Sequence, residues 1–219
     1  MAPADIKKEG AAYDLPLAIG MLAAEEEVKT VLLERYMIMG ELSLDGTLQP
    51  IQGVLPMALA ARKAGFEGII LPEPNAREAA VVKGLKVYGL KNLLEVTRFL
   101  NGIQAYEQTE VDTEAEFAAH AFSSDLDFSD VRGQENVRRA MEVAAAGGHN
   151  MLMVGPPGAG KSMMAKRLPS ILPPLNLEEA LETTKIYSVS GMMARRKESD
   201  GMSSALIVQR PFRSPHHTI

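Results

Sequence analysis

The feature that most limits how this chain can fold is a glycine-rich turn, GPPGAGKS at residues 155–162. The apolar run MLMV precedes it, and a sequence that favours a helix follows it. The turn matches the phosphate-loop pattern at every fixed position, and a strand before it with a helix after it is the context that this pattern requires. We therefore expect the turn to bind phosphate. The alternative is a strand-to-helix turn that binds nothing.

The residue types in the turn suit the phosphates of ATP and an accompanying Mg²⁺. Glycines allow successive backbone N–H groups to converge on the β-phosphate. We expect the Lys161 ammonium to reach the β- and γ-phosphates, and the Ser162 hydroxyl to be a ligand of Mg²⁺. The predicted nucleotide-binding residues of the turn are Gly155, Pro156, Pro157, Gly158, Ala159, Gly160, Lys161 and Ser162.

Hydrolysis of ATP needs an acidic residue at the end of a second strand, where it positions Mg²⁺. None of the acidic residues after Ser162 follows an aliphatic run, and the strand-like ALIVQR at 205–210 ends in Gln209 and Arg210. A buried parallel strand at 151–154 also needs neighbours on both sides. We therefore expect the sequence to stop partway through its nucleotide domain, with no catalytic residue within it.

Residues 1–102 predict a separate α/β domain. Helices are expected over 14–28, with Asp14 as N-cap, and over 53–66, 74–84 and 92–102. Strands are expected at 68–72 and 86–90, and a hairpin is expected within 36–53 around Asp45-Gly46, the dipeptide that favours a tight turn. The order α-β-β-α-β-α-β-α gives one domain of about 100 residues, which is a usual size.

A change in charge separates the two parts of the chain. Residues 103–130 carry 8 Asp or Glu and no Lys or Arg, whereas residues 131–219 carry 12 Lys or Arg against 7 Asp or Glu. The acidic segment, taken as 103–126, predicts a solvated linker with one short amphipathic turn. Residues 127–219 then form the nucleotide domain, which begins with a helix ended by Gly147-Gly148.

Composition excludes several classes of protein. The chain has no cysteine, so disulfides and thiolate metal sites are absent. The first ten residues lack the apolar core of a signal peptide, and no apolar run approaches the length of about 18 residues that spans a bilayer. We expect a cytoplasmic protein without a membrane partner. The pair His216-His217 has neither cysteine nor a nearby carboxylate to complete a metal site.

The turn, the helix GQENVRRAM and the closing segment RPFRSPHHTI together resemble the bacterial magnesium chelatase-like AAA+ ATPases of the YifB/ComM type. The resemblance covers the whole chain. It implies a Lon protease-like domain of the ribosomal S5 domain 2-like fold at 1–102, followed by the start of a P-loop NTPase domain truncated before its acidic metal-binding strand. It also implies that Val131 and Gln134 lie near the nucleotide base.

The Lon-like half raises the alternative of an ATP-dependent peptidase. Such peptidases use a Ser nucleophile activated by a Lys. In this sequence Asp14 stands at the best match for the Ser, and Leu55 stands where the Lys is expected. Both groups are missing, so we expect a module without peptidase activity.

The resemblance further implies that the full-length protein forms a homo-hexameric ring and couples ATP hydrolysis to remodelling of DNA, as in branch migration during transformation. The weak basic excess after residue 130 fits that partner. Basic residues that could contact phosphates of DNA are Lys185, Arg195, Arg196, Lys197, Arg210 and Arg213. A solvated surface is the equal alternative for them. A different alternative is the ATPase subunit of a metal-chelatase complex.

Overall fold

The computed structural model describes residues 11–120, 126–193 and 205–213. The chain divides into two compact units, residues 1–113 with 183–206 and residues 114–182 with 207–219. The sequence predicts one nucleotide domain at 127–219, whereas this division assigns 183–206 to the first unit. The domain boundaries given above stay a prediction, and each unit is described by itself.

The first unit is built on a three-stranded parallel sheet with strand order β1-β4-β5. Its strands are β1 (Tyr36–Ile38), β4 (Gly68–Pro72) and β5 (Lys86–Leu90). All residues of β4 are buried, as expected for a central parallel strand that is covered on both faces. The expected strands at 68–72 and 86–90 are therefore confirmed, and so is a mixed α/β fold with a parallel sheet.

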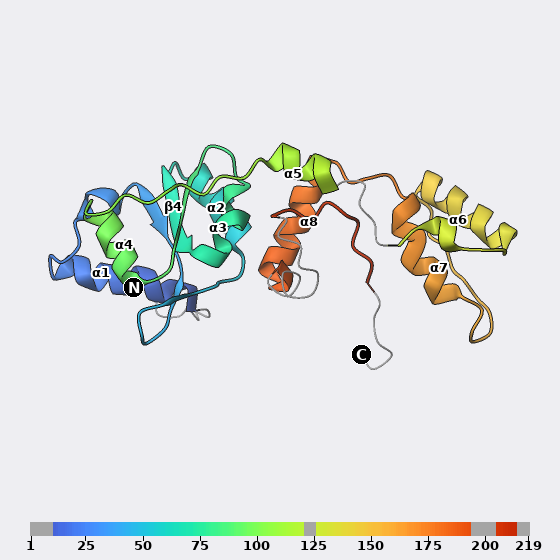
Figure 1. The fold of residues 1–219 in the computed structure, drawn as a ribbon, viewed down its shortest axis with the longest axis horizontal. Helices are drawn as coiled ribbons and strands as arrows, with labels where there is room; N and C mark the ends of the chain where they lie inside the picture. The colour runs from blue at the N-terminus through green and yellow to red at the C-terminus, as the bar shows by residue number, and fades with distance from the viewer. Residues whose placement is uncertain (1–10, 121–125, 194–204, 214–219) are drawn as a thin grey trace. The chain divides into compact units, whose positions relative to one another are not determined.

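Helices cover both faces of this sheet, as Figure 1 shows for β4. Helices α1 (Asp14–Ala24) and α4 (Leu93–Leu100) lie on one side, and α2 (Val54–Lys63) and α3 (Ala76–Ala80) lie on the other. Because side chains alternate along a strand, Ile70 packs in the α1–α4 core, while its neighbours Ile69 and Leu71 are buried towards the opposite face. The core of this unit thus consists of two layers separated by the sheet.

The hairpin around Asp45-Gly46 is confirmed, although it is shorter than expected. Strands β2 (Glu41–Leu42) and β3 (Leu48–Gln49) pair antiparallel, and Gly46 has φ +85°. The Asp45 carboxylate accepts hydrogen bonds from the Thr47 hydroxyl at 2.7 Å and the Thr47 N–H at 3.0 Å. These bonds lower the pKa of Asp45. The extended run before the turn divides, because its first part, β1, joins the parallel sheet.

The first helix differs from its prediction at both ends. Asp14 is its first residue rather than its N-cap, and the cap residue Tyr13 makes no side-chain capping bond. The N–H of Leu15 instead donates to the backbone carbonyl of Gly40 at 3.0 Å, so the main chain satisfies that group. The helix ends at Ala24 instead of residue 28. Three consecutive glutamates, 25–27, follow, and negative charge is unfavourable at a helix C-terminus.

The second unit is helical in its described residues. Its elements include the 3-10 turns η4 (Phe128–Asp130) and η5 (Leu168–Ile171) and the helices α6 (Glu135–Gly147) and α7 (Lys161–Arg167). Helix α5 (Thr113–His120) forms in the acidic segment, and the division between the two units falls within α8 (Leu177–Val189), after Glu182. Helix α6 ends at Gly148, with φ +62°, as expected. Met141 is buried on α6, whereas Val143 is 50% exposed.

Two expected strands are absent from the described structure. Residues 151–154 are not a strand, and Leu152 and Val154 are 86% and 87% exposed. The described residues of this unit contain no strand with which 151–154 could pair, and a lone strand leaves its backbone groups unsatisfied. Residues 205–210 are not a strand either, although Ala205–Val208 are buried.

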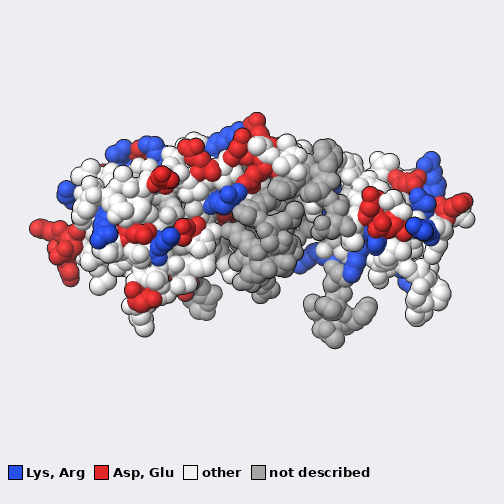
Figure 2. Space-filling view, in the orientation of Figure 1, with Lys and Arg blue, Asp and Glu red and all other residues white. Residues whose placement is uncertain are grey.

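Charged groups at the starts of the three parallel strands form one ion-pair cluster. Glu67, before β4, pairs with Arg35, before β1, and with Lys86 at 2.7 Å, the first residue of β5. The Lys86 ammonium and then the Arg35 guanidinium hold the pKa of Glu67 below its usual value. Figure 2 shows acidic and basic side chains interspersed on the visible face, with no continuous basic patch over the described residues. None of the described helices combines the length and apolar character needed to cross a membrane.

Gly68 is expected to be intolerant of any side chain. A Cβ atom there would lie 2.5 Å from the Lys86 carbonyl oxygen and 2.7 Å from the Tyr36 ring. We predict that Gly68→Ala lowers the free energy of unfolding of the first unit by about 3 kcal/mol or more, because a neighbouring backbone atom has to move. Gly20→Ala is the matched control, since a Cβ on that exposed helical glycine meets nothing within 4 Å. It should raise stability by about 0.5–1 kcal/mol.

Urea denaturation followed by tyrosine fluorescence measures this difference. The chain has no Trp and 5 Tyr residues, and all of the tyrosines fall in residues 1–113 or 183–206 of the first unit. Equal unfolding midpoints for the two variants would contradict the close approach of β1, β4 and β5 at Gly68.

Candidate phosphate-binding site

A small apolar core supports the glycine-rich loop in the second unit. Its buried members are Phe128, Val131, Met141 and Met164, which come from η4, the segment after it, α6 and α7. Partly buried side chains of Val137, Met153, Leu168 and Ile171 pack against them. The two helices that flank the loop, α6 and α7, therefore pack against the same core.

The loop needs glycine at two positions for reasons of backbone conformation. Gly158 and Gly160 have φ of +79° and +78°. A Cβ on Gly158 would meet nothing within 4 Å, so a lack of space does not explain the residue type. Gly160 is the N-cap of α7, and its carbonyl accepts the first helical bond, from the N–H of Met164 at 3.0 Å. The left-handed turn thus directs the chain from the loop into the helix.

The Lys161 side chain folds back over the loop. Its ammonium donates to the carbonyl oxygens of Gly155 and Pro156, both at 2.7 Å. An ammonium has three N–H donors, so these bonds leave one for another acceptor. They also hold the two carbonyl dipoles against a positive charge. The Lys161 ammonium, the cation that the sequence predicts for phosphate, therefore lies at the loop itself.

The two residues expected near a nucleotide base lie in different surroundings. Val131 is 2% exposed and belongs to the supporting core. Gln134 is exposed, and its side-chain amide donates to the Ala159 carbonyl in the loop at 3.1 Å. Gln134 also has a left-handed backbone, with φ +49° and ψ +46°. Nothing in the sequence indicated this contact between Gln134 and the loop.

Ser162 lies in the first turn of α7 and is exposed. No group of three or more His, Asp or Glu side chains that could hold a metal ion occurs within the described residues. A metal ion at this loop would therefore need ligands from a bound molecule in addition to the Ser162 hydroxyl.

An ion pair that the sequence analysis missed fixes the far end of α7. The Arg167 guanidinium bonds to one oxygen of the Asp130 carboxylate in η4, at 3.0 Å and 3.1 Å from its two nitrogens. It also donates to the Met163 carbonyl at 3.3 Å. The Arg167 side chain is 17% exposed. Partial burial makes such a pair more effective than one fully in water.

A cavity of about 280 Å³ adjoins the loop. Side chains of α6 and the apolar run 151–154 line it, together with Gln134, Ala159 and Lys161. Among the described residues that line this cavity, Lys161 is the one that carries a charge. The cavity thus combines an apolar wall with a single cation, which suits a ligand that has an apolar part and an anionic part.

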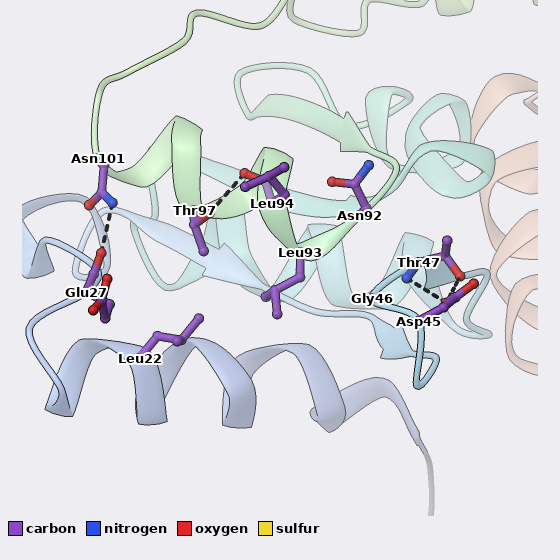
Figure 3. A pocket seen from close by; sticks show the side chains of 10 residues that line it. All are labelled: Leu22, Glu27, Asp45, Gly46, Thr47, Asn92, Leu93, Leu94, Thr97 and Asn101. Carbon is purple, nitrogen blue, oxygen red and sulfur yellow. Dashed lines mark hydrogen bonds between the residues drawn. The ribbon is translucent and has the colours of Figure 1, made fainter.

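A cavity of about 640 Å³ in the first unit has the opposite character (Figure 3). It lies between α1, α4 and the hairpin turn, and its charged lining residues are Glu27 and Asp45. Its polar side chains mostly bond to its own walls; the Asn101 amide, for example, accepts from the Lys29 N–H and donates to the Glu27 carbonyl, both at 2.9 Å. Two carboxylates repel phosphate, so this cavity does not fit a nucleotide.

The positions considered for a peptidase dyad hold no such groups. Asp14 starts α1, and Leu55 is fully buried in α2. The backbone N–H of Leu55 donates to the Glu78 carboxylate at 3.1 Å and to the Ser188 hydroxyl at 3.4 Å. The leucine that stands in place of the lysine packs in the core and cannot act as the general base of a peptidase.

The basic residues considered for DNA are only partly described. Arg195, Arg196 and Lys197 lie outside the described residues, and so does the pair His216-His217 that was considered for a metal site. Arg210 donates to the Pro173 carbonyl at 2.8 Å and pairs with the Glu179 carboxylate at 3.6 Å. The Arg210 guanidinium thus already has an acidic partner within the second unit.

Comparison with protein families gives the same description for both parts of the chain. Residues 127–219 match the family "Magnesium chelatase, subunit ChlI", and residues 1–75 match "Subunit ChlI of Mg-chelatase". The first match includes the whole glycine-rich loop and the core beneath it.

Similar proteins extend the relation over the full chain. It is 41% identical over 221 residues to the competence protein ComM of Haemophilus influenzae, covering all of this chain and 41% of that protein. It is 42% identical over 218 residues to YifB of Escherichia coli (strain K12), covering all of this chain and 40% of that protein. The chain therefore spans about two fifths of these relatives. Lon protease 2 of Bacillus subtilis is 30% identical over 98 residues, which is 43% of this chain and 17% of that protein.

The positive φ of the loop glycines predicts a difference between two substitutions. Gly160→Ala forces a Cβ into the left-handed region and should cost about 1 kcal/mol, raising amide hydrogen exchange in residues 155–164 about five-fold. Gly155→Ala is the control, because its φ is not positive and its Cβ would find only ordinary contacts at 3.9 Å and 4.0 Å. Hydrogen exchange read by mass spectrometry compares the two variants. Similar rates in both would show that the loop does not depend on this conformation.

Proposed function

Because this chain belongs to the magnesium chelatase-like family of the YifB and ComM type, we propose that its loop, residues 155–162, binds the phosphates of Mg-ATP. The observation that carries the proposal is the Lys161 ammonium over a loop with two left-handed glycines, beside an apolar cavity that has no other charge among its described lining residues. This arrangement matches what a phosphate loop requires, namely flexible backbone donors and one mobile cation.

Each loop residue then has a physical role. Gly158 and Gly160 allow the backbone conformation in which N–H groups converge on a phosphate. Lys161 compensates phosphate charge through its third N–H donor, or by exchanging one of its carbonyl bonds for a phosphate oxygen. The Ser162 hydroxyl supplies one oxygen ligand to Mg²⁺.

The residues present fit Mg²⁺ only as part of a nucleotide complex. Mg²⁺ binds few protein oxygens and usually takes its other ligands from phosphates and water, and the described residues contain no acidic cluster. When bound, Mg²⁺ neutralises charge on the phosphates. The cavity of about 280 Å³, with Val137, Ala140 and Met164 in its lining, would take the flat face of the adenine base.

For this chain by itself we propose weak nucleotide binding and negligible turnover. The downstream acidic residues that are described do not form a metal site, and Glu179 bonds to the Asn176 N–H and to Arg210. In the longer protein we propose an AAA+ ATPase that hydrolyses ATP as a six-membered ring, with residues 1–102 as a ribosomal S5 domain 2-like domain without peptidase activity.

DNA is the partner that we propose for the longer protein. Two observations support it: the similar protein from Haemophilus influenzae is named a competence protein, and residues 131–219 carry an excess of basic residues. The alternative, an ATPase subunit that drives insertion of a metal into a porphyrin, is supported by the family description "Magnesium chelatase, subunit ChlI". The DNA proposal has a direct test on this chain.

Titration with a fluorescent ATP analogue, with and without Mg²⁺, tests nucleotide binding. We expect saturable binding that Mg²⁺ strengthens and that Lys161→Ala weakens at least about ten-fold, because a charge-assisted bond to phosphate is lost. Lys166→Ala, an exposed basic residue of the same helix, is the matched control and should bind normally. Phosphate release is followed in the same samples.

Two results would contradict the account. Equal affinity for Lys161→Ala and Lys166→Ala would mean that the loop is not the binding site. Robust phosphate release would mean that the chain contains a catalytic acid that we have not identified.

Binding of a labelled DNA duplex and of a branched DNA, measured by fluorescence anisotropy from 50 to 300 mM salt, tests the DNA partner. If DNA phosphates are neutralised by this chain, the logarithm of the affinity should fall linearly with the logarithm of the salt concentration. Absence of binding at low salt, or binding without a salt dependence, would count against DNA.

A further inference from the structure

We propose that Gln134 is a positioning residue, which orients one peptide group of the loop so that its N–H faces a bound phosphate. The inference deepens the proposed function and rests on it. Its basis is the hydrogen bond of 3.1 Å from the Gln134 side-chain amide to the Ala159 carbonyl.

Because the peptide group is planar, the bond to the Ala159 carbonyl also determines where the next N–H points. In a trans peptide the C=O and the next N–H lie in one plane and point in opposite directions. The Ala159 carbonyl belongs to the same peptide group as the Gly160 N–H. Because Gln134 holds the carbonyl towards α6, the Gly160 N–H points away from Gln134.

This peptide group needs such a restraint because a glycine follows it. Gly160 has φ +78°, and glycine adopts both signs of φ at little cost. A flip of the peptide would turn the Ala159 carbonyl towards the place where phosphate binds, and two acceptors there repel each other. The other bonds within the loop do not hold this group: Lys161 bonds to the carbonyls of Gly155 and Pro156, and the Ala159 N–H, which donates to the Pro156 carbonyl at 3.4 Å, belongs to the preceding peptide group.

The backbone of Gln134 also points to a role in the site. Its left-handed conformation is uncommon for a residue other than glycine, asparagine or aspartate. It stands at the N-cap of α6 without making a side-chain capping bond. A glycine would suit the conformation better, but it has no side-chain amide that could donate to the Ala159 carbonyl. Strained backbone of this kind concentrates at binding sites.

Two substitutions separate the side-chain bond from the backbone. Gln134→Met keeps the length of the side chain but removes the donor, and Gln134→Gly removes the donor while relieving the backbone. We expect both to weaken binding of the Mg-ATP analogue about ten-fold, and we expect the thermal midpoint of Gln134→Gly to be unchanged or raised. Glu142→Gln, an exposed change on the same helix, is the control and should bind normally.

The amide resonance of Gly160 in the chain without nucleotide gives a second readout. We expect this resonance to broaden in Gln134→Met and in Gln134→Gly, as the peptide group exchanges between two orientations, and to stay sharp in the control. A general loss of structure would instead broaden the resonances of α6 and α7 together.

The results separate the two proposals. A Gly160 resonance that both Gln134 variants leave unchanged overturns the positioning role, and so does normal nucleotide affinity in Gln134→Gly, because the backbone alone would then matter. If the unsubstituted chain binds no nucleotide while the Gly160 resonance still broadens in both variants, the proposed function fails and the restraint on the peptide group stands.

Discussion

A loop that presents N–H groups to an anion must direct its carbonyl groups away from that anion, and the candidate site depends on this constraint. Lys161 takes the carbonyls of Gly155 and Pro156, and Gln134 takes that of Ala159. The two side chains come from the helices on either side of the loop, α7 and α6. The loop conformation is therefore set by helix packing as well as by glycine content.

The helices beside the loop pack on a small apolar core. A core of four buried side chains and the Arg167–Asp130 ion pair hold α6, α7 and η4 together. On the other side of the cavity Met151, Leu152 and Val154 remain exposed, while Met153 packs against the core. The first unit is different, because its parallel sheet is buried on both faces, and its larger cavity is acidic. Within the described residues, the chemistry for an anion thus belongs to the second unit.

Sequence alone predicted the features that local rules decide. The glycine pattern predicted a turn before α7, and the dipeptide Asp45-Gly46 predicted the hairpin. Short apolar runs predicted β4 and β5. It failed for residues 151–154, because a strand depends on neighbours that the run does not encode. It also missed the Gln134–Ala159 bond, which joins residues 25 apart in the sequence and needs a left-handed backbone at a glutamine. The strand-like residues 205–210 do not form a strand, although Ala205–Val208 are buried.

The most direct test of the central claim is the change in backbone amide resonances when Mg-ATP is added to the ¹⁵N-labelled chain. The account predicts that the largest shifts fall on the amides of Gly158, Ala159, Gly160 and Lys161, with smaller shifts at the cavity residues of α6. The amides around Asp45 and Asn92 in the first unit should not move. Shifts centred on that first-unit cavity, or none at the loop under saturating nucleotide, would contradict a phosphate-binding role for residues 155–162.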